Sequence, residues 1–284
     1  MLKNPDGTRR ALAGVAVMLA LMVILATPAM AVTNGKLDGN NHPYVGLMVA
    51  KNSSGTPLWR CSGTLMSPIV FLTAGHCTEA PAATAEIWFD ADVESGIPGN
   101  GYPNTGQASG TVHTHPNYDP DAFYVRDLGV VILSAPVFMA NYGAVPTQDQ
   151  LDVYATKRGQ GKAWFTAVGY GLQQSFPDAA SWKEHNVRVR MYATPKLNQI
   201  NGGIVGDFSL LLSNNAHSGG TCFGDSGGPN FLFATNTVAG VTSFGLNGNC
   251  AGTGGVFRVD RSWSLKFIDD AMDGIVGDDY SGGP

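Results

Sequence analysis

Apolar residues gather in short segments, and turn-forming residues separate these segments along most of the chain. Such segments predict β-strands, because a buried helix needs a longer apolar pattern with a period near 3.6. The segment at 128–133 is apolar throughout, which favours a strand buried on both faces. Strands are predicted at 44–50, 62–66, 69–73, 85–89, 108–113, 128–133, 162–169, 187–192, 209–212, 238–244 and 255–259.

Residues 260–272 show a helical pattern instead, with apolar side chains three to five positions apart and Asp260 as a candidate N-cap. A turn-rich segment at 136–151 separates two groups of strands. The chain is therefore predicted to be all-β with a C-terminal helix. The predicted organisation is an N-terminal β-domain at 32–140, a C-terminal β-domain with the helix at 141–273, and a flexible Gly- and Asp-rich tail at 274–284.

Residues 1–31 have the pattern of an export signal. A basic start precedes an apolar run at 11–26, and Ala29-Met30-Ala31 is typical of a cleavage site. The alternative is an uncleaved anchor, but about sixteen apolar residues are few for a membrane span of roughly 20. We expect cleavage after Ala31 and a secreted protein without stable membrane association.

Composition and charge narrow the function classes. The 284 residues are 44% hydrophobic and 14% charged, which allows a sizeable core. The formal net charge is −5, and residues 1–31 carry three basic side chains and one acidic one, so the rest of the chain carries −7. A negative surface repels phosphate backbones, which argues against binding to nucleic acid.

The four cysteines are candidates for disulfides, because an exported protein meets an oxidising environment. Three pairings are open. Cys61 with Cys77 and Cys222 with Cys250 close the shortest loops, and each bond would stabilise the fold by roughly 3 kcal/mol in the chain-entropy description. A zinc site is the alternative, but the spacing contains no Cys-x-x-Cys pair.

One stretch carries candidate chemistry, at residues 222–229. It reads Cys-Phe-Gly-Asp-Ser-Gly-Gly-Pro and places Ser226 among three glycines. Glycines allow sharp turns and a close approach of the backbone to a ligand, and neighbouring N–H groups can bind a developing negative charge. The simpler interpretation is a tight turn in an exported β-protein.

A nucleophilic serine needs a base and an orienting carboxylate. Among six histidines, His76 stands out because it directly follows an apolar strand and precedes Cys77. The small residues Ala74 and Gly75 before it favour a tightly packed site. A histidine after a strand is more often structural, so the assignment depends on the rest of the pattern.

That pattern resembles the chymotrypsin/trypsin-like serine endopeptidases. Leu-Thr-Ala-Gly-His-Cys at 72–77, Asp-Leu-Gly-Val-Val-Ile-Leu at 127–133 and Gly-Asp-Ser-Gly-Gly-Pro at 224–229 match the histidine, aspartate and serine motifs of the family, in the family's order. The match extends over 32–272. The resemblance implies two antiparallel Greek-key β-barrels with the active site in the cleft between them.

The resemblance also implies roles for single residues. Ser226 would be the nucleophile, His76 the general base and acid, and Asp127 the group that orients the imidazole. The N–H groups of Gly224 and Ser226 would form the oxyanion hole. Asp119 and Asp121 are rival carboxylates, but neither leads into an apolar strand. The expected substrates are polypeptides, and we expect a monomer with no cofactor and no metal.

Three other interpretations were weighed. The Gly-x-Ser-x-Gly elbow of α/β-hydrolases also fits 224–228, but that fold needs a histidine after the serine, and no histidine follows Ser226. A catalytically silent, protease-like binding module is the main alternative. An exported structural or adhesive β-protein would have no reason to carry all three motifs.

The resemblance suggests a second role for Asp225. In the family, a newly cut N-terminus folds inward and its ammonium group pairs with the aspartate that precedes the nucleophile. Val32-Thr33-Asn34-Gly35 follows the predicted cleavage site and resembles the family's mature start. The hypothesis is that signal cleavage itself creates the activating terminus. The alternative is that local N–H groups alone hold Asp225.

The specificity pocket follows from the resemblance as well. Gly220 stands where trypsin-like members carry an aspartate, so a preference for Lys or Arg is not expected. Ser243-Phe244-Gly245 resembles the strand that pairs with the substrate backbone. We expect an apolar or aromatic residue before the scissile bond. The predicted pocket residues are Gly220, Thr221, Ser243, Phe244, Gly245 and Gly255.

Two further groups were considered as metal ligands. Acidic residues between 86 and 94 imitate a calcium loop, although a solvated acidic loop is favoured. His113 and His115 could form a metal pair, although a plain strand end is favoured.

Overall fold

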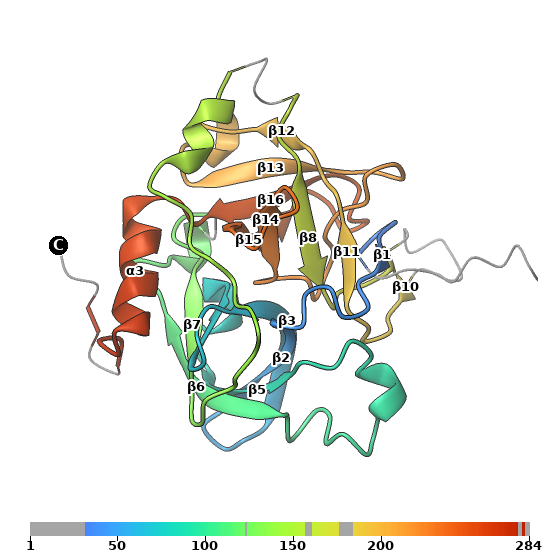
Figure 1. Ribbon diagram of the computed structural model, residues 1–284, viewed down its shortest axis with the longest axis vertical. Coiled ribbons are helices and arrows are strands. Elements are labelled where there is room, and N and C mark those ends of the chain that lie inside the picture. Colours follow the sequence, from blue (N-terminus) through green and yellow to red (C-terminus); the bar gives the residue numbers. More distant parts are fainter. Residues whose placement is uncertain (1–31, 123, 157–160, 176–183, 278–279, 282–284) are drawn as a thin grey trace, which may run out of the picture.

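Two β units and one α-helix make up the part of the chain that the structure describes (Figure 1). The computed structural model describes residues 32–122, 124–156, 161–175, 184–277 and 280–281. The predicted signal peptide at 1–31 therefore lies outside the described residues. Within the described residues, no helix is long and apolar enough to span a bilayer.

The first unit is a closed barrel in the order β2-β3-β4-β7-β6-β5, in the lower half of Figure 1. β5 pairs with β2 and β6 rather than with β4, which gives a Greek-key connection. The six strands predicted before residue 134 are confirmed. Their bounds are β2 Val45–Asn52, β3 Pro57–Leu65, β4 Val70–Thr73, β5 Ala82–Trp88, β6 Ala108–Thr114 and β7 Gly129–Leu133.

The second unit is an antiparallel sheet in the order β1-β11-β8-β14-β15-β16-β13-β12. It curls back on itself, because the N–H of Phe165 binds the carbonyl of Pro195 and the N–H of Leu197 binds that of Ala163. The predicted all-β fold with two barrel-like units is thus confirmed. The bounds are β1 Lys36–Leu37, β8 Phe165–Gly169, β11 Met191–Ala193, β12 Leu197–Gln199, β13 Ser209–Asn214, β14 Pro229–Leu232, β15 Val238–Gly245 and β16 Gly252–Arg258.

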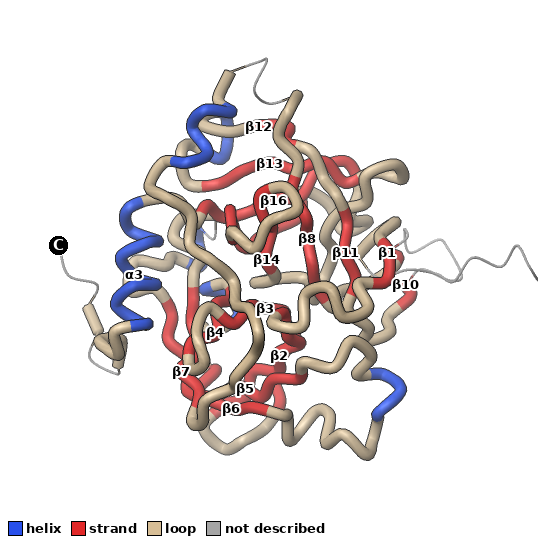
Figure 2. The backbone as a smooth tube through the Cα atoms, in the orientation of Figure 1, coloured by secondary structure: helices blue, strands red, loops and turns tan. Residues whose placement is uncertain are grey.

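Smaller elements lie at the periphery, where Figure 2 shows short helical segments around the strands. A two-stranded ribbon joins β9 (Gln174–Ser175) and β10 (Glu184–His185). The 3₁₀ turns are η1 Gly75–Cys77, η2 Glu94–Gly96, η3 Pro120–Ala122, η4 Gln150–Tyr154 and η5 Gly203–Val205.

The N-terminal segment belongs to the second sheet, although it precedes the barrel in the chain. β1 pairs with β11, and Thr33 pairs with Gly220. A buried arginine, Arg190, fixes this arrangement: its guanidinium binds Asp38 at 3.0 Å and the carbonyl of Phe89 at 2.9 Å. One side chain therefore ties the N-terminal segment to both β units.

The predicted C-terminal helix is confirmed as α3 (Ser262–Met272), but its N-cap is Arg261, so the assignment of Asp260 as cap was wrong. Asp260 is buried and instead binds the guanidinium of Arg258 at 2.8 Å and the N–H of Leu151. A buried guanidinium needs a counter-charge more than the helix needs a cap. The helix contacts β4 and β7 of the barrel, not only the second sheet.

Part of the predicted flexible tail is attached to this helix. Val276 is buried, and the Tyr280 hydroxyl donates a hydrogen bond to Asp270. The Tyr280 ring lies 5.8 Å from that of Phe267. Flexibility of the tail as a whole stays a prediction.

Two apolar clusters support the site. The larger one fills the barrel around Phe71 and Trp88 and includes Ile268 on the buried face of α3. The smaller one lies inside the second sheet, around Phe165 and Leu210. The two units meet where β3 contacts β14 and β2 contacts β8. This junction brings the end of β4 close to the loop that precedes β14.

Candidate active site

A buried carboxylate, Asp127, organises the barrel side of the junction. It stands at the entrance of β7 with no exposed side-chain surface. The backbone N–H of His76 donates to Oδ1 at 2.9 Å, and the Nδ1 of His76 lies 2.9 Å from Oδ2. Because a carboxylate accepts, Nδ1 carries the proton, and the neutral ring then keeps Nε2 as a free base.

A third donor reaches the same carboxylate from the second sheet. The hydroxyl of Ser243, in β15, donates to Oδ2 of Asp127. The sequence assigned Ser243 to the substrate pocket only, so this contact was missed. The rival carboxylates differ, since Asp121 is exposed and Asp119 accepts a local N–H from Asp121 in the same turn.

The backbone around His76 is confined by its neighbours. A side chain at Gly75 would come within 3.1 Å of the N of Leu128 and of the Tyr118 ring. Cys77 is bonded to Cys61 of β3. The short turn η1 is thus fixed on both sides, which holds the imidazole in one place, as the small residues before it predicted.

Two opposing effects set the pKa of His76. Burial lowers the pKa of the ring, but the charge of Asp127, its hydrogen bond and the charge of Glu79 raise it. The net pKa lies above the ordinary 6.5. The carboxylate therefore stabilises the imidazolium, which is what a base needs once it has taken a proton.

The loop at 222–228 presents Ser226 opposite this histidine. The carbonyl of Ser226 accepts the N–H of Ser62 in β3, and the N–H of Gly227 binds the carbonyl of Thr242 in β15, both at 2.8 Å. Gly227 has φ +76°, and a Cβ there would lie 2.0 Å from Oγ1 of Thr73. Only glycine fits that position, which explains the glycine directly after the serine.

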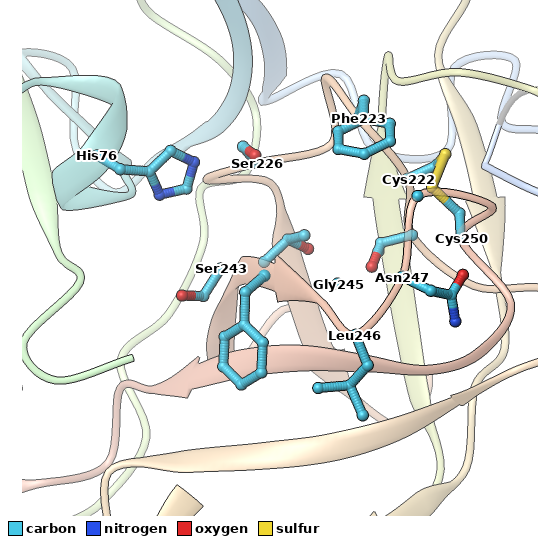
Figure 3. Close-up of a pocket in the computed structure, with 13 residues that line it drawn as sticks. His76, Cys222, Phe223, Ser226, Ser243, Gly245, Leu246, Asn247 and Cys250 are labelled. Carbon is cyan, nitrogen blue, oxygen red and sulfur yellow. A yellow bond between two sulfur atoms is a disulfide. The ribbon is translucent and has the colours of Figure 1, made fainter. Parts of the chain in front are cut away.

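His76 and Ser226 line the same cavity, of about 530 Å³, and both point into it in Figure 3. Four predicted pocket residues line it as well: Thr221, Ser243, Phe244 and Gly245. The remaining lining residues, which the sequence did not assign to the pocket, are Cys222, Phe223, Thr242, Leu246, Asn247, Gly248 and Cys250. Residues 246–248 directly follow the predicted strand, and that adjacency was the available signal.

Two predicted pocket residues, Gly220 and Gly255, are not among the residues that line this cavity, and their role in specificity stays a prediction. The N–H of Gly220 binds the carbonyl of Thr33, and a Cβ on Gly220 would meet the side chain of Asn214 at 2.3 Å. A Cβ on Gly255 would overlap the ring of Phe244, also at 2.3 Å. Gly255 therefore accommodates that aromatic ring rather than a ligand.

Two N–H groups beside the nucleophile have no protein acceptor. No described residue accepts a hydrogen bond from the N–H of Gly224 or of Ser226. The carbonyl of Phe223 is bound by the N–H of Leu172 at 2.8 Å. Since the C=O and N–H of a trans peptide point in opposite directions, the N–H of Gly224 points away from Leu172. These donors fit an oxyanion hole.

Asp225 is fully buried and accepts the N–H groups of Gly171 and Cys222, at 2.8 and 2.9 Å. Burial raises the pKa of its carboxyl to about 7, although both N–H groups and the charge of Arg60 act against this rise. Among the described residues, none forms an ion pair with it. The charge of Arg60 acts on this carboxylate only from beyond ion-pair distance, so the direct partner that a buried carboxylate needs is not present among the described residues.

The predicted partner of Asp225 is buried nearby in the second unit. Val32 is fully buried and packs on Met191 and Ala193. Within the described part of the chain, no hydrogen bond joins Val32 to Asp225. The pairing of these two residues therefore stays a prediction.

Both disulfides with the shortest loops are present. Cys61 is bonded to Cys77, and Cys222 to Cys250, with Cα atoms 6.2 and 5.2 Å apart. All four sulfurs are consumed, which rules out the zinc alternative. Cys222–Cys250 lies in the cavity wall.

The acidic residues between 86 and 94 engage separate cations. Glu86 binds Lys51 at 3.2 Å and Glu94 binds Arg188 at 2.8 Å. They do not converge on one point, so the solvated loop is the better description. The absence of a bound metal stays a prediction.

The effect of Asp127 on His76 can be measured directly. We expect the His76 ring to titrate above pH 6.5 in the NMR signal of its Cε1–H, because the carboxylate favours the imidazolium. In Asp127→Asn the charge and the charged hydrogen bond of the carboxylate are lost, so the titration should move to lower pH. An unchanged His76 titration in the variant would contradict the assignment.

Comparisons with known proteins identify the family of this chain. The family model described as Trypsin matches residues 34–263. Serine protease 1 of Drosophila melanogaster is 26% identical over 221 residues, 77% of each chain, and brachyurin of Leptuca pugilator is 28% identical over 68% of this chain and 79% of its own.

Solved structures share the fold. A structure titled HL collagenase superposes with a TM-score of 0.64 at 21% identity, over 86% of this chain and all of its own. Human heparin binding protein gives 0.59 at 19% identity, over 89% of this chain and 99% of its own. With a family match over most of its length and the chymotrypsin fold around the site, the chain belongs to the trypsin family of serine proteases.

Proposed function

We propose that this protein is a serine endopeptidase that uses Ser226 as nucleophile. The observation that carries the proposal is the orientation of His76: Asp127 holds its Nδ1, and the ring faces the cavity that Ser226 also lines. A neutral imidazole in this tautomer can take the serine proton through Nε2.

The reaction then follows from the geometry. Oγ of Ser226 attacks the peptide carbonyl carbon while its proton moves to His76. The carbonyl oxygen becomes an oxyanion, and the N–H groups of Gly224 and Ser226 bind it. The C–N bond breaks as His76 passes its proton to the leaving amine. Water, deprotonated by the same ring, hydrolyses the acyl-enzyme and restores Ser226.

The main alternative is a catalytically silent binding module. One structural neighbour is named for binding heparin, a polyanion. This chain has 22 acidic against 17 basic residues, which opposes that ligand. The contact of Asp127 with His76, and the cavity that His76 and Ser226 both line, support the enzyme over the silent module.

We propose that the enzyme acts outside the cytoplasm on polypeptides. The export pattern at 1–31 and the two disulfides support this location. We propose further that it works as a monomer without a cofactor, and neither with nucleic acid nor in stable contact with a membrane.

The cavity supports a preference for an apolar or aromatic residue before the scissile bond. Apart from His76, its lining residues carry no ionisable side chain. Phe223 and Leu246 are 58% and 51% exposed and extend the apolar surface at the rim. With no anion to pair with, a Lys or Arg side chain would lose hydration without compensation.

The environment of Asp225 supports activation by the new N-terminus. An ammonium group on Val32 would supply the counter-charge that the buried carboxylate lacks. Thr33 is already paired beside the loop, since its carbonyl accepts the N–H of Gly220 at 3.1 Å. Signal cleavage after Ala31 would create this group without a further propeptide.

The nucleophile is tested with a fluorophosphonate probe. We expect the protein to be labelled at Ser226 and to hydrolyse a pool of peptides, because His76 can activate this hydroxyl. Ser226→Ala should reduce both signals to background, whereas Ser54→Ala, in an exposed turn outside the cavity, should change neither. Labelling that persists in Ser226→Ala would contradict the assignment, and a wild-type protein that is never labelled would favour the binding module.

The preference is tested by placing a charge in the cavity wall. We expect Thr221→Asp to increase cleavage after Lys or Arg by at least about tenfold relative to cleavage after Phe, since a hydrogen bond to a charged group contributes about 1.5–3 kcal/mol. Thr221→Asn is the neutral control. Strict cleavage after Lys or Arg by the unmodified enzyme would refute the preference.

The activating terminus is tested with two forms of the chain. A protein that begins at Val32 should exceed one that retains Ala31 in kcat/KM by about 10²-fold, if the buried ion pair contributes about 3 kcal/mol. Asp225→Asn should remove the difference between the two forms, because the neutral amide needs no cation. Equal activity of both forms with Asp225 intact would disprove the mechanism.

A further inference from the structure

We propose that Ser62 is a positioning residue of the oxyanion hole, a role that rests on the proposed serine endopeptidase function. Ser62 lies in β3 of the barrel, directly after Cys61, and is completely buried. It does not line the substrate cavity. Its side chain nevertheless reaches the backbone of the residue that supplies one of the two oxyanion donors.

Ser62 binds the loop at two points. Its hydroxyl donates to the carbonyl of Gly224 at 2.9 Å, and its backbone N–H donates to the carbonyl of Ser226 at 2.8 Å. The hydroxyl oxygen also accepts the N–H of Tyr170, from the end of β8, at 3.0 Å. Because that N–H occupies an acceptor site of the oxygen, the hydroxyl proton is directed towards Gly224.

Gly224 needs such a contact because its backbone is free to turn. Its φ is +93°, and glycine crosses between positive and negative φ with little cost. The peptide before it is held through the carbonyl of Phe223, which Leu172 binds. The peptide after it is held at both ends: the N–H of Asp225 donates to the carbonyl of Cys222 at 3.0 Å, and Ser62 binds the carbonyl of Gly224 itself.

The result is a loop whose carbonyl groups all point back into the protein. Leu172, Ser62 and Gly228 bind the carbonyls of residues 223, 224, 225 and 226. The N–H groups of Gly224 and Ser226 are thereby left without an acceptor among the described residues. If the carbonyl of Gly224 were released, it could turn towards the site of the oxyanion and repel it.

A role in positioning predicts a specific kinetic effect. Loss of an oxyanion donor outright costs about 10²–10³-fold in kcat, and loss of one supporting hydrogen bond costs less. We expect Ser62→Ala to lower kcat for a peptide amide by about tenfold, with KM changed less than about twofold, because ground-state binding does not use the oxyanion hole.

A peptide boronate distinguishes positioning from general destabilisation. Its boron bonds Oγ of Ser226 and places an oxygen in the oxyanion hole, while the proton of the hydroxyl passes to His76. The inhibition constant of the boronate should rise in Ser62→Ala by the same factor as kcat falls, because both depend on the same two donors. The affinity of a product peptide should remain unchanged.

Ser264→Ala is a matched control. Ser264 is equally buried, and its hydroxyl also donates to a backbone carbonyl at 2.9 Å, that of Arg258 near α3. It should lose similar thermal stability and retain kcat. If Ser62→Ala does not fold, Ser62→Gly keeps the backbone bond to Ser226 and carries the same expectation.

The outcomes are separable. If wild type hydrolyses peptides and Ser62→Ala matches Ser264→Ala in kcat and in boronate affinity, the positioning role is overturned and the proposed function stands. A fall in kcat without a parallel loss of boronate affinity also overturns it. A wild-type protein that neither cleaves peptides nor binds the boronate overturns the proposed function, and this role with it.

Discussion

The backbone of residues 222–228 is held from both β units, and the candidate site depends on that anchoring. Ser62 in the barrel and Thr242 in the second sheet bind the two ends of the peptide group that follows the nucleophile: the N–H of Ser62 donates to the carbonyl of Ser226, and the N–H of Gly227 donates to the carbonyl of Thr242, both at 2.8 Å. A loop with so many glycines would otherwise sample many conformations. Because the anchors come from different units, the position of Ser226 depends on how the units pack, as does its distance from His76.

Asp127 and Asp225 are both buried carboxylates, and their surroundings differ in one respect. Asp127 faces an imidazole that can take up a positive charge, and a hydroxyl from the second sheet supports it. Burial raises the pKa of Asp225 to about 7, because it outweighs the backbone N–H groups and the charge of Arg60, which lower that pKa. The first carboxylate thus has its cation within the site, created during each turnover. The second has no such cation within the described residues, which is why a group from outside the loop can act on it.

Local pattern was sufficient to predict most strands, because each segment carries its own apolar signal. Contiguous motifs also singled out His76, Asp127 and Ser226 as candidates, and their catalytic roles stay a prediction. Local pattern failed where contacts between distant parts of the fold determine the role of a residue. Asp260 has the chemistry of an N-cap, but a buried arginine competes for it.

The sequence also could not predict the direction in which a side chain points. Spacing predicted that Gly220 and Gly255 lie near the pocket. It could not predict towards which neighbouring atoms a Cβ at each position would point. Ser62 carries no motif signal at all. Its importance comes from two acceptors more than 160 residues away in the chain, and only the folded arrangement brings them together.

The N-terminal segment links these elements. Thr33 pairs with Gly220, and its hydroxyl binds the buried side chain of Asn214 at 2.7 Å. Asn214 in turn donates to the carbonyl of Thr221, a residue of the cavity wall. A change at Thr33 can therefore reach the cavity wall through two hydrogen bonds, and under the proposed pairing of Val32 with Asp225 a new N-terminus would reach the serine loop as well. These two routes share residues 220–225, so substrate binding and the oxyanion hole should respond to the terminus together rather than separately.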